Sequence, residues 1–410
     1  MGWDTPQIQS KTFANGSHRI IPATETLKRI NPIKRKFGIS RLANVTGLDC
    51  LGIPVALAIR PNSRSVAVSQ GKGMTLDDAK ASAMMEAIEI WHAEHFDGEV
   101  LYGKVKDLKH KHRFLDHSRF PKVVGGEFDD DTPCLWVKGT QLISGAPVLL
   151  PYEMIHADYT HPHQPAHGYF PASTNGLASG NSYLEAVCHA ITEVVERDSL
   201  SLWHFTAADE QTRQRIDPVS VDDENCKNLI EKIERAGLQC GIWDVTSDNG
   251  IACILCVILE DGNHPGHLGL GSGCHPDRNV ALRRALTEAA QTRLNYVSGS
   301  RDDLHLDEYS QSGLVDKQNY AEHVFAQEDC PKSFADVSHH SHQTLQEDYD
   351  FLLESLKAID INEIGMVNLT REEHGIPVVR IIIPGLEAPH DDDSYLAGPR
   401  AKAIANSGDC

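Results

Sequence analysis

The chain has 410 residues, of which 40% are hydrophobic, and its formal net charge of −20 comes from 38 basic and 58 acidic residues. This composition is typical of a globular protein with one large core or two domains, and the negative charge argues against a nucleic-acid or membrane-surface function. No apolar run approaches the roughly 20 residues of a membrane span, and the N-terminus lacks a signal-peptide core. We therefore expect a cytoplasmic location, in which the ten scattered cysteines are reduced.

The first distinctive segment is a basic run, KRINPIKRK, at residues 28–36. It falls within residues 1–40, which we interpret as an N-terminal extension of a main domain at residues 41–410. In an acidic protein such a run is usually a solvated face. Binding of phosphate or of an acidic peptide is the alternative interpretation.

Four segments predict β-hairpins, because each has two stretches of strand-forming residues joined by a polar turn. Three of them share an Asx-aliphatic-Thr opening, a turn, Gly-Ile-Pro or Gly-Ile-Ala, and a final apolar run. These are NVTGLDCLGIPVALAI (44–59), DVTSDNGIACILCVIL (244–259) and NLTREEHGIPVVRIII (368–383). The fourth is a looser copy, WVKGTQLISGAPVLLP (136–151). This recurrence indicates internal duplication.

Three helices are predicted after Gly-rich turns, SQGKG (69–73), NGLASGNS (175–182) and GLGSGCHPD (269–277). The first helix follows Thr75 as its N-cap. All three contain one template: a polar residue, Ala, a large apolar residue, any residue, Glu, an apolar residue, any residue, and Glu or Gln. The polar positions, at i, i+4 and i+7, share one helix face. They are Ser82, Glu86 and Glu89; His189, Glu193 and Glu196; and Arg284, Glu288 and Gln291.

One polar stripe of this kind is usually the solvated side of a surface helix. Solvation does not require a fixed register, so three copies with the same offsets predict that the stripes meet at a common cleft. The alternation of hairpin, Gly-rich turn and helix predicts an α/β (α+β) fold in which hairpins form sheets and helices pack on them. Two further helices, at 222–236 and 344–358, are expected to cover sheet faces, and residues 300–342 are predicted to form a long loop or lid.

Two other groups of residues could be redox or metal sites, and for both we favour a structural role. Cys253 and Cys256 form a C-x-x-C, but they lie in an apolar strand, where positions i and i+3 point to opposite faces. The histidines of two further runs lack the spacing of a known ligand set. We expect them in surface loops: His156, His161, His163 and His167, and His339, His340 and His342.

Several carboxylates at one cleft cannot all stay ionised without compensating cations. Carboxylate ligands without Cys favour Mg²⁺, which commonly shares its coordination shell with substrate phosphates. Lys72, Arg197 and Arg284 supply the positive charge that phosphate oxygens need, and the helix N-termini after the Gly-rich turns are potential anion sites. None of these turns is a Walker A loop. The residues therefore predict a nucleotide site of another design, in which Glu-held Mg²⁺ ions bind a triphosphate.

Taken together, four motifs of this chain closely resemble the YcaO family of ATP-dependent enzymes that modify peptide backbones. The motifs are SRLANVTGLDCLGIPV, SQGKG followed by SAMMEAIE, ASGNSYLEAVCHAITEVVERD, and GSGCHPDRNVALRRALTEAAQTR. The resemblance implies a YcaO-like fold with ATP and Mg²⁺ as cofactors. It implies metal ligands at Glu86, Glu89, Glu185, Glu193, Glu196 and Glu288, and nucleotide contacts at Ser82, Asn181, Arg197, Arg284 and Gln291; the charge argument adds Lys72.

Two positions qualify this assignment. Glu185 forms an S-x-x-E pattern with Ser182, so a helix-capping role explains it nearly as well as a ligand role. Ile90 follows Glu89 where the family often has Glu-Arg, so we expect no Arg contact from the first helix. No general base is identified: His189 is a candidate, and helix packing or hydrogen bonding is its alternative role.

The resemblance implies that a nucleophile adds to a backbone amide carbon and that the amide oxygen is phosphorylated by ATP, so that phosphate can leave. The segment IIIPGLEAPHDDDSYLAGPRA is similar to YcaO proteins encoded beside a TfuA partner, and the end KAIANSGDC lacks the Pro-rich tail of many azoline formers. Both features favour thioamide formation with sulfide on a ribosomal peptide. An azoline-forming cyclodehydratase is the alternative enzyme, and an ATP-binding scaffold without turnover is the alternative of another class.

The expected partners are a precursor peptide, a TfuA-like protein and a sulfide donor. No leader-peptide recognition domain is apparent before residue 40, so we expect a separate protein to deliver the peptide. A homodimer is expected, since most enzymes of this size are symmetric dimers.

Overall fold

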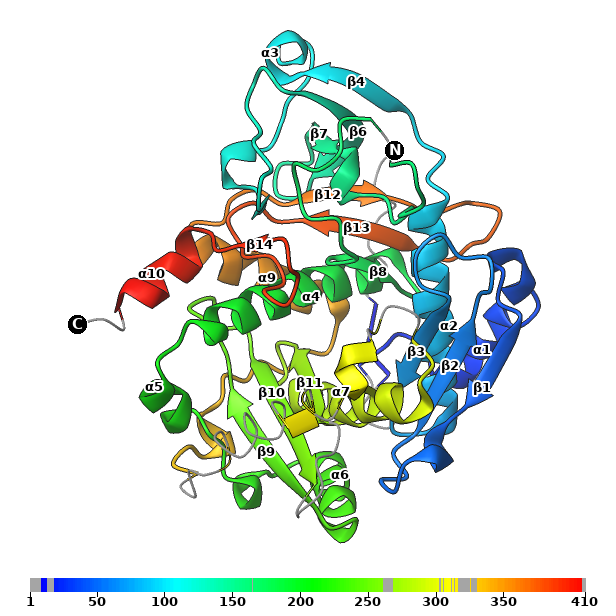
Figure 1. The fold of residues 1–410 in the computed structure, drawn as a ribbon, viewed down its shortest axis with the longest axis vertical. Coiled ribbons are helices and arrows are strands. Elements are labelled where there is room, and N and C mark those ends of the chain that lie inside the picture. Colours follow the sequence, from blue (N-terminus) through cyan, green and yellow to red (C-terminus); the bar gives the residue numbers. More distant parts are fainter. Residues whose placement is uncertain are drawn as a thin grey trace.

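The computed structural model describes residues 9–12, 18–163, 165–260, 268–301, 304, 306–310, 312, 314–315, 325 and 330–407. In this part of the chain, the strands form three main sheets and a small pair, β5 (Lys122–Val123) with β14 (Tyr395–Leu396). Each main sheet carries a long helix, and the three sheet-and-helix units surround the centre of the molecule (Figure 1).

The first unit is a three-stranded antiparallel sheet with helix α2 packed on it. Its elements are β1 (Arg41–Asn44), β2 (Val55–Ile59), β3 (Val68–Lys72) and α2 (Leu76–Glu94). Helix α2 begins where the sequence predicts: Thr75 is the N-cap and forms a capping box with Asp78. Its buried side chains are mostly Ala, Met and Ile, which lie close against the sheet and against α1 (Ala23–Ile30).

The second unit repeats this arrangement (Figure 1). Its elements are β9 (Leu238–Asp244), β10 (Cys253–Glu260), β11 (Gly269–Cys274) and α7 (Arg278–Ser298). Cys253 faces one hydrophobic cluster and Cys256 the opposite one, and both are fully buried. The expected core role of the C-x-x-C is therefore confirmed.

The third unit is assembled from two distant parts of the chain. Strand β8 (Leu177–Ser179) and helix α4 (Tyr183–His204) join the last hairpin, β12 (Gly365–Asn368) and β13 (Val378–Ile382). The looser hairpin, β6 (Pro133–Gln141) with β7 (Pro147–Pro151), extends the same sheet through β12, and β4 (Val100–Lys104) forms its edge. Hairpin 136–151 and the Gly-rich segment at 175–182 therefore lie in the same sheet, but the last hairpin lies between them.

The Asx-aliphatic-Thr openings have the same structure in all three units. In the first, the Thr46 N–H donates to Asn44 Oδ1 (3.1 Å), and Thr46 Oγ1 accepts the Val55 N–H (3.1 Å). The second and third units repeat both bonds, with Thr246 between Asp244 and Cys253, and Thr370 between Asn368 and Val378. The Asx residue ends one strand and the Thr side chain starts the next, which confirms that the repeats are hairpins.

The Gly-rich segments were predicted to be turns. Residues 175–176 do form a turn, with Gly176 at φ 78°, but the segments otherwise contribute strands or strand ends in β3, β8 and β11. Their glycines allow the helix backbone to approach the sheet. A Cβ on Gly71 would lie 2.1 Å from Ala83 N, and one on Gly271 would lie 2.2 Å from Ala289 N. At Gly71 and Gly271, glycine is therefore required for close strand-to-helix packing rather than for a turn.

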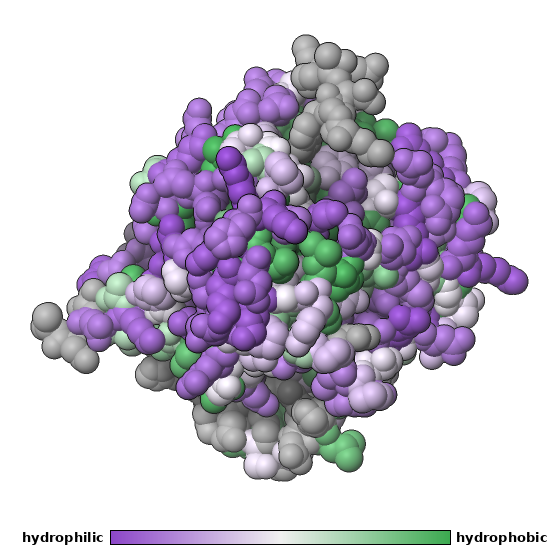
Figure 2. All heavy atoms as spheres, turned by 90° about the horizontal axis from the view of Figure 1, so that it is seen from above, coloured by the Kyte–Doolittle hydropathy of each residue, from purple (hydrophilic) through white to green (hydrophobic). Residues whose placement is uncertain are grey.

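The remaining helices match the predictions at 222–236 and 344–358. They are α6 (Glu224–Arg235), capped by Asp223, and α9 (Leu345–Ala358), capped by Thr344. Three shorter helices are α3 (Val105–Leu108), α5 (Ala208–Arg213) and α10 (Pro399–Ser407). None of the described helices is both long and apolar enough to span a bilayer. Seen from the β4 end, the surface is mainly hydrophilic, with an apolar area near the centre of this face (Figure 2).

Two further segments contact the core. Much of the predicted lid at 300–342 lies outside the described residues, but from residue 330 the chain packs closely: Phe334 is buried, and Ser338 Oγ donates to Gly250 O (2.6 Å). The predicted N-terminal extension also joins the core, because Leu27 and Ile30 of α1 are buried against α2. The basic run includes the exposed side chains of Lys28, Arg29, Arg35 and Lys36.

Candidate active site

A cavity of about 580 Å³ lies between the three units and is lined by α2, α4 and α7. Every residue predicted for the site borders it. They are Lys72, Ser82, Glu86, Glu89, Asn181, Glu185, His189, Glu193, Glu196, Arg197, Arg284, Glu288 and Gln291. The three polar stripes therefore meet at one place, as their common register predicts.

Side chains of the stripes join the units in a closed ring. Glu89 of the first unit accepts from Ser179 N and Oγ of the third (2.8 and 2.6 Å). Glu196 of the third accepts from Ser272 Oγ of the second (2.7 Å), and Glu288 of the second pairs with Lys72 of the first. Each helix thus contributes a carboxylate to the Gly-rich strand of another unit, which fixes the three stripes relative to one another.

Three carboxyl groups of the cavity have strongly raised pKa values. Removal from water raises the pKa of Glu86 to about 7, that of Glu89 to about 8 and that of Glu193 to about 7; neighbouring carboxylates add to each shift. Glu288 differs: shielding from water raises its pKa, but Lys72 and Arg197 lower it more, so the net shift is downward. The cavity therefore has more potential negative charge than its own cations neutralise.

Cationic side chains lie among these carboxyl groups. Burial lowers the pKa of Arg197, but Glu196, Glu288 and Glu193 outweigh this effect and hold it above its ordinary value. Burial and the nearby Arg19 lower the pKa of Arg284 to about 10. Arg284 Nη1 donates a hydrogen bond to Cys274 O (3.0 Å). These guanidinium groups remain charged at neutral pH, so they can bind phosphate oxygens.

Glu185 and His189 are held by other contacts in this structure. The Glu185 carboxylate accepts from Asn181 N and Nδ2 (3.1 and 3.0 Å), from Ile20 N (3.0 Å) and from Arg19 Nη1 (3.2 Å), while its own N–H donates to Ser182 Oγ (3.2 Å). The capping half of the S-x-x-E pattern is therefore present. Burial, followed by Arg284, lowers the pKa of His189 well below its ordinary value, so its imidazole is neutral.

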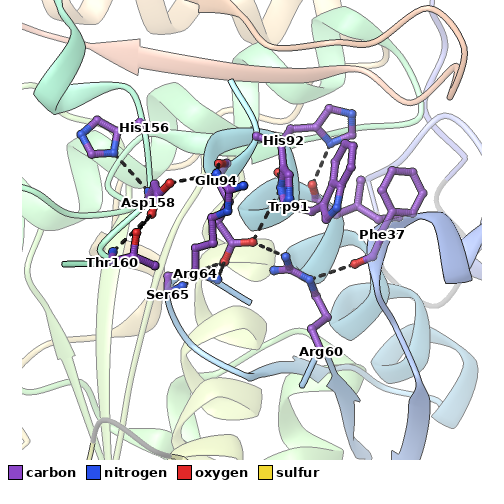
Figure 3. Close-up of polar contacts among 12 residues, drawn as sticks. Phe37, Arg60, Arg64, Ser65, Trp91, His92, Glu94, His156, Asp158 and Thr160 are labelled. Atoms are coloured by element: carbon purple, nitrogen blue, oxygen red, sulfur yellow. Dashed lines mark hydrogen bonds and ion pairs between the residues drawn. The ribbon is translucent and has the colours of Figure 1, made fainter. Parts of the chain in front are cut away.

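A separate polar network fixes the end of α2 that follows the stripe (Figure 3). Glu94 is 2% exposed and pairs with Arg60. It also accepts from Arg64 N (3.0 Å) and from Ser65 N and Oγ (3.1 and 2.7 Å). Because these donors occupy both carboxylate oxygens, Glu94 anchors the helix to the loop after β2 and is not available as a ligand.

The donor set fits Mg²⁺ bound together with phosphates. Among the described residues, no three His, Cys, Asp or Glu side chains are grouped closely enough to hold a metal ion by themselves. Mg²⁺ usually takes one or two carboxylates and completes its shell with water and substrate phosphates. Hard carboxylate oxygens with raised pKa values, interspersed with guanidinium groups, match that requirement.

The sequence analysis missed the strand residues that contact the stripes. They precede the glycine in each Gly-rich segment: Gln70, whose N–H donates to Glu86 (3.4 Å), Ser179 and Ser272. In each segment, a polar residue before a glycine could have indicated a contact with the helices. The interpretation of these segments as turns prevented that prediction. Another correction concerns His156, which is buried rather than in a surface loop.

Comparison with known proteins places these features in a family context. A family model described as YcaO cyclodehydratase, ATP- and Mg²⁺-binding, matches residues 70–387. An uncharacterized protein in the tfuA 3′ region of Rhizobium leguminosarum bv. trifolii is 34% identical, and the alignment covers 93% of this chain and 92% of that protein.

Two solved structures share the fold. YcaO from Methanopyrus kandleri, bound with AMPPCP and Mg²⁺, has a TM-score of 0.74 and 22% identity, and the match covers 96% of this chain and 99% of that one. A heterocyclase in complex with substrate and cofactor has a TM-score of 0.77 and 20% identity, over 94% of this chain and 54% of that one. At these identities the likeness establishes the mixed α/β architecture alone.

Proposed function

Because this chain belongs to the YcaO family, whose members bind ATP and Mg²⁺, we propose that it uses ATP to convert a peptide backbone amide into a thioamide. The observation that carries the ATP-dependent activity is the meeting of three acidic stripes, from three separate units, at one cavity. A degenerate, non-catalytic member would not need to keep acids on all three helices.

The residues of the cavity have separable tasks in this proposal. Glu86, Glu89, Glu193, Glu196 and Glu288 hold Mg²⁺, with Glu185 as a further ligand once its contacts to the N-terminal segment are exchanged. Lys72, Arg197 and Arg284 bind the triphosphate oxygens, and Ser82, Asn181 and Gln291 supply neutral hydrogen bonds. Bound ATP would supply the phosphoryl group that makes the amide oxygen a leaving group.

Preorganisation of the charges is the contribution of this chain to that step. Ser179 and Ser272 orient two carboxylates through hydrogen bonds, and Lys72 holds Glu288. These groups are in place before the reaction, so little reorganisation is needed when charge develops on the phosphoryl group. His189 lies in the same cavity, but burial and Arg284 lower its pKa, so it is a weak base there.

Thioamide formation is supported by the relative from a tfuA region, because it is similar over nearly the whole of both chains. We propose a TfuA-like partner, a sulfide donor and a separate peptide-recognition protein, with a ribosomal peptide as substrate. Azoline formation by cyclodehydration is the second candidate. It is supported by the description of the family as cyclodehydratases and by the shared fold with a heterocyclase.

An intact-mass experiment separates the candidates. The precursor peptide encoded nearest this gene is incubated with the protein, the partner encoded beside it, ATP, Mg²⁺ and sulfide. Replacement of one oxygen by sulfur, dependent on both ATP and sulfide, is the result expected for thioamidation. Loss of one water without a need for sulfide would establish a cyclodehydratase instead, and no ATP-dependent change would favour the scaffold alternative.

A further inference from the structure

The contacts between the three units follow one pattern, and one contact departs from it. The last polar residue of each stripe meets the polar residue that precedes a packing glycine in another unit. The pairs are Glu89 with Ser179 (2.6 Å), Glu196 with Ser272 (2.7 Å) and Gln291 with Gln70 (3.5 Å). The first two pairs join a carboxylate to a hydroxyl group, whereas the third joins two uncharged carboxamides. We call this third contact, between Gln70 of β3 and Gln291 of α7, the neutral junction.

The neutral junction has unused hydrogen-bonding capacity. Gln70 is 2% exposed, and its Nε2 is buried without a hydrogen-bond partner in the described part of the chain. Asn295 lies one turn after Gln291 on α7, so the two side chains share a helix face. Asn295 Oδ1 is also buried, and no described residue donates to it. One donor and one acceptor are therefore unpaired, and each is costly to leave so.

The active-site cavity adjoins this junction directly. Gln70, Gln291 and Asn295 all line the cavity of about 580 Å³. Strand β3 meets α7 near the centre of the molecule (Figure 1). The terminal torsions of Asn and Gln side chains are broad, so rotation of either carboxamide can turn its unused atom toward the cavity at little cost. A ligand in the cavity is therefore within reach of both groups.

The junction lies beside the acids and away from the main cluster of cations. The Gln70 N–H donates to Glu86 (3.4 Å), one of the carboxylates assigned to Mg²⁺. Arg284, which has Arg19 nearby, begins the α7 stripe, and Asn295 follows 11 residues or about 16 Å further along the helix. The cations favour the nucleoside and inner phosphates at the Arg284 end. The acceptor of the phosphoryl group, which lies in line with the leaving ADP, then belongs at the other end.

We propose that Gln70 and Asn295 bind the peptide backbone at the amide that is modified, an inference that rests on the proposed function. Gln70 Nε2 donates to the amide carbonyl oxygen, and Asn295 Oδ1 accepts a backbone N–H of the same peptide. A peptide backbone is uncharged and offers both an acceptor and a donor, as the junction requires. The donated hydrogen bond polarises the carbonyl carbon toward a nucleophile, and the second lone pair of the oxygen stays free for the phosphoryl group.

Equilibrium binding tests this site without turnover. Fluorescence anisotropy follows the labelled precursor peptide with the protein, the partner encoded beside it, Mg²⁺ and AMPPCP, which cannot transfer its terminal phosphoryl group. Gln70→Leu and Asn295→Leu keep the size of the side chain and remove its polar atoms. Each is expected to raise the Kd for the peptide about 10-fold, because one hydrogen bond is lost. An unchanged Kd in both variants would overturn the proposal.

Asn279→Leu is the matched control for these variants. Asn279 is on the same helix, and its Oδ1 is also buried without a partner among the described residues, but it does not line the cavity. Its Kd for the peptide should equal that of the wild type. A 10-fold rise in this control would show that loss of any buried carboxamide of α7 weakens peptide binding, and would overturn the specific assignment.

Two further measurements separate this site from the nucleotide site and from the proposed function. The Kd for Mg²⁺-AMPPCP should be unchanged in Gln70→Leu and Asn295→Leu. A rise in this Kd with unchanged peptide binding would assign the junction to the adenine base, whose edge also has a donor and an acceptor. In turnover, kcat/KM for the peptide should fall about 10-fold while the KM for ATP stays constant. A wild-type protein that causes no ATP-dependent mass change would refute the proposed function, and anisotropy would still decide whether the junction binds the peptide.

Discussion

Replacing Glu193 with Gln should have opposite effects on metal-free stability and on nucleotide binding. The folded environment raises the pKa of Glu193 from 4.5 to about 7. A difference of this size corresponds to about 3 kcal/mol between the protonated and ionised forms. We treat this as an upper value, since the side chain borders the open cavity.

The sign of the effect depends on pH. Because the pKa of Glu193 is higher in the folded state than in the unfolded state, binding of a proton at this carboxyl group stabilises the folded protein. This contribution is complete below about pH 4.5 and is lost as the pH rises through about 7. Gln cannot ionise, so Glu193→Gln should match the wild type at pH 4 and be more stable at pH 8, by at most about 3 kcal/mol. Its affinity for Mg²⁺-ATP should fall at least about 100-fold, because a ligand is lost.

Denaturant unfolding with a chelator at both pH values, and calorimetric titration with Mg²⁺-ATP, measure the two effects of Glu193→Gln. Arg213→Gln, at an exposed site on α5, is the control: neither its stability nor its affinity for Mg²⁺-ATP should change in the way expected for Glu193→Gln. Wild-type affinity for Mg²⁺-ATP would refute the assignment of Glu193 to the metal site. A variant that is less stable than the wild type at pH 8 without metal would refute the reasoning about buried charge.

Three further predictions concern packing and charge. Gly271→Ala should lower the midpoint of unfolding measurably, since the new Cβ would lie 2.2 Å from Ala289 N. Gly47→Ala, which has open space around it, should leave the midpoint unchanged. Equal midpoints for the two variants would contradict the close-packing role of Gly271. Cys253→Ala should cost about 1–2 kcal/mol of unfolding free energy and leave turnover unchanged, because the thiol is a core group; loss of turnover in a folded variant would contradict this. Lys72→Met should weaken ATP binding about 10-fold. It should also raise the pKa of Glu288, which NMR titration can measure, because Lys72 lowers that pKa in the wild type. An unchanged pKa would show that the Lys72–Glu288 ion pair is absent in solution.

Much of the local structure follows from short-range sequence patterns. The Asx and Thr residues of the hairpins, the caps at Thr75 and Thr344, and the spacing of the stripes all act within about ten residues, where backbone geometry determines the result. The repeated register was also sufficient to predict that the three stripes share one cleft. The roles of these residues as ligands remain predictions for the experiments above.

Only the tertiary structure shows which strands and helices make up each unit and how closely they pack. The Gly-rich segments have turn-like composition, and only the helix backbone lying against Gly71 and Gly271 shows why glycine is needed in a strand. The pairing of β8 with β13 joins residues about two hundred positions apart, which no local pattern encodes.

The same distinction applies to the site. The sequence by itself determined which residues carry charge and which helix face they share, because both properties follow from residue type and helical period. It did not determine the ring of contacts from Glu89, Glu196 and Glu288 to strands of other units. Those features depend on surfaces that meet only after the chain has folded, since burial and charge pairing arise from residues distant in the sequence.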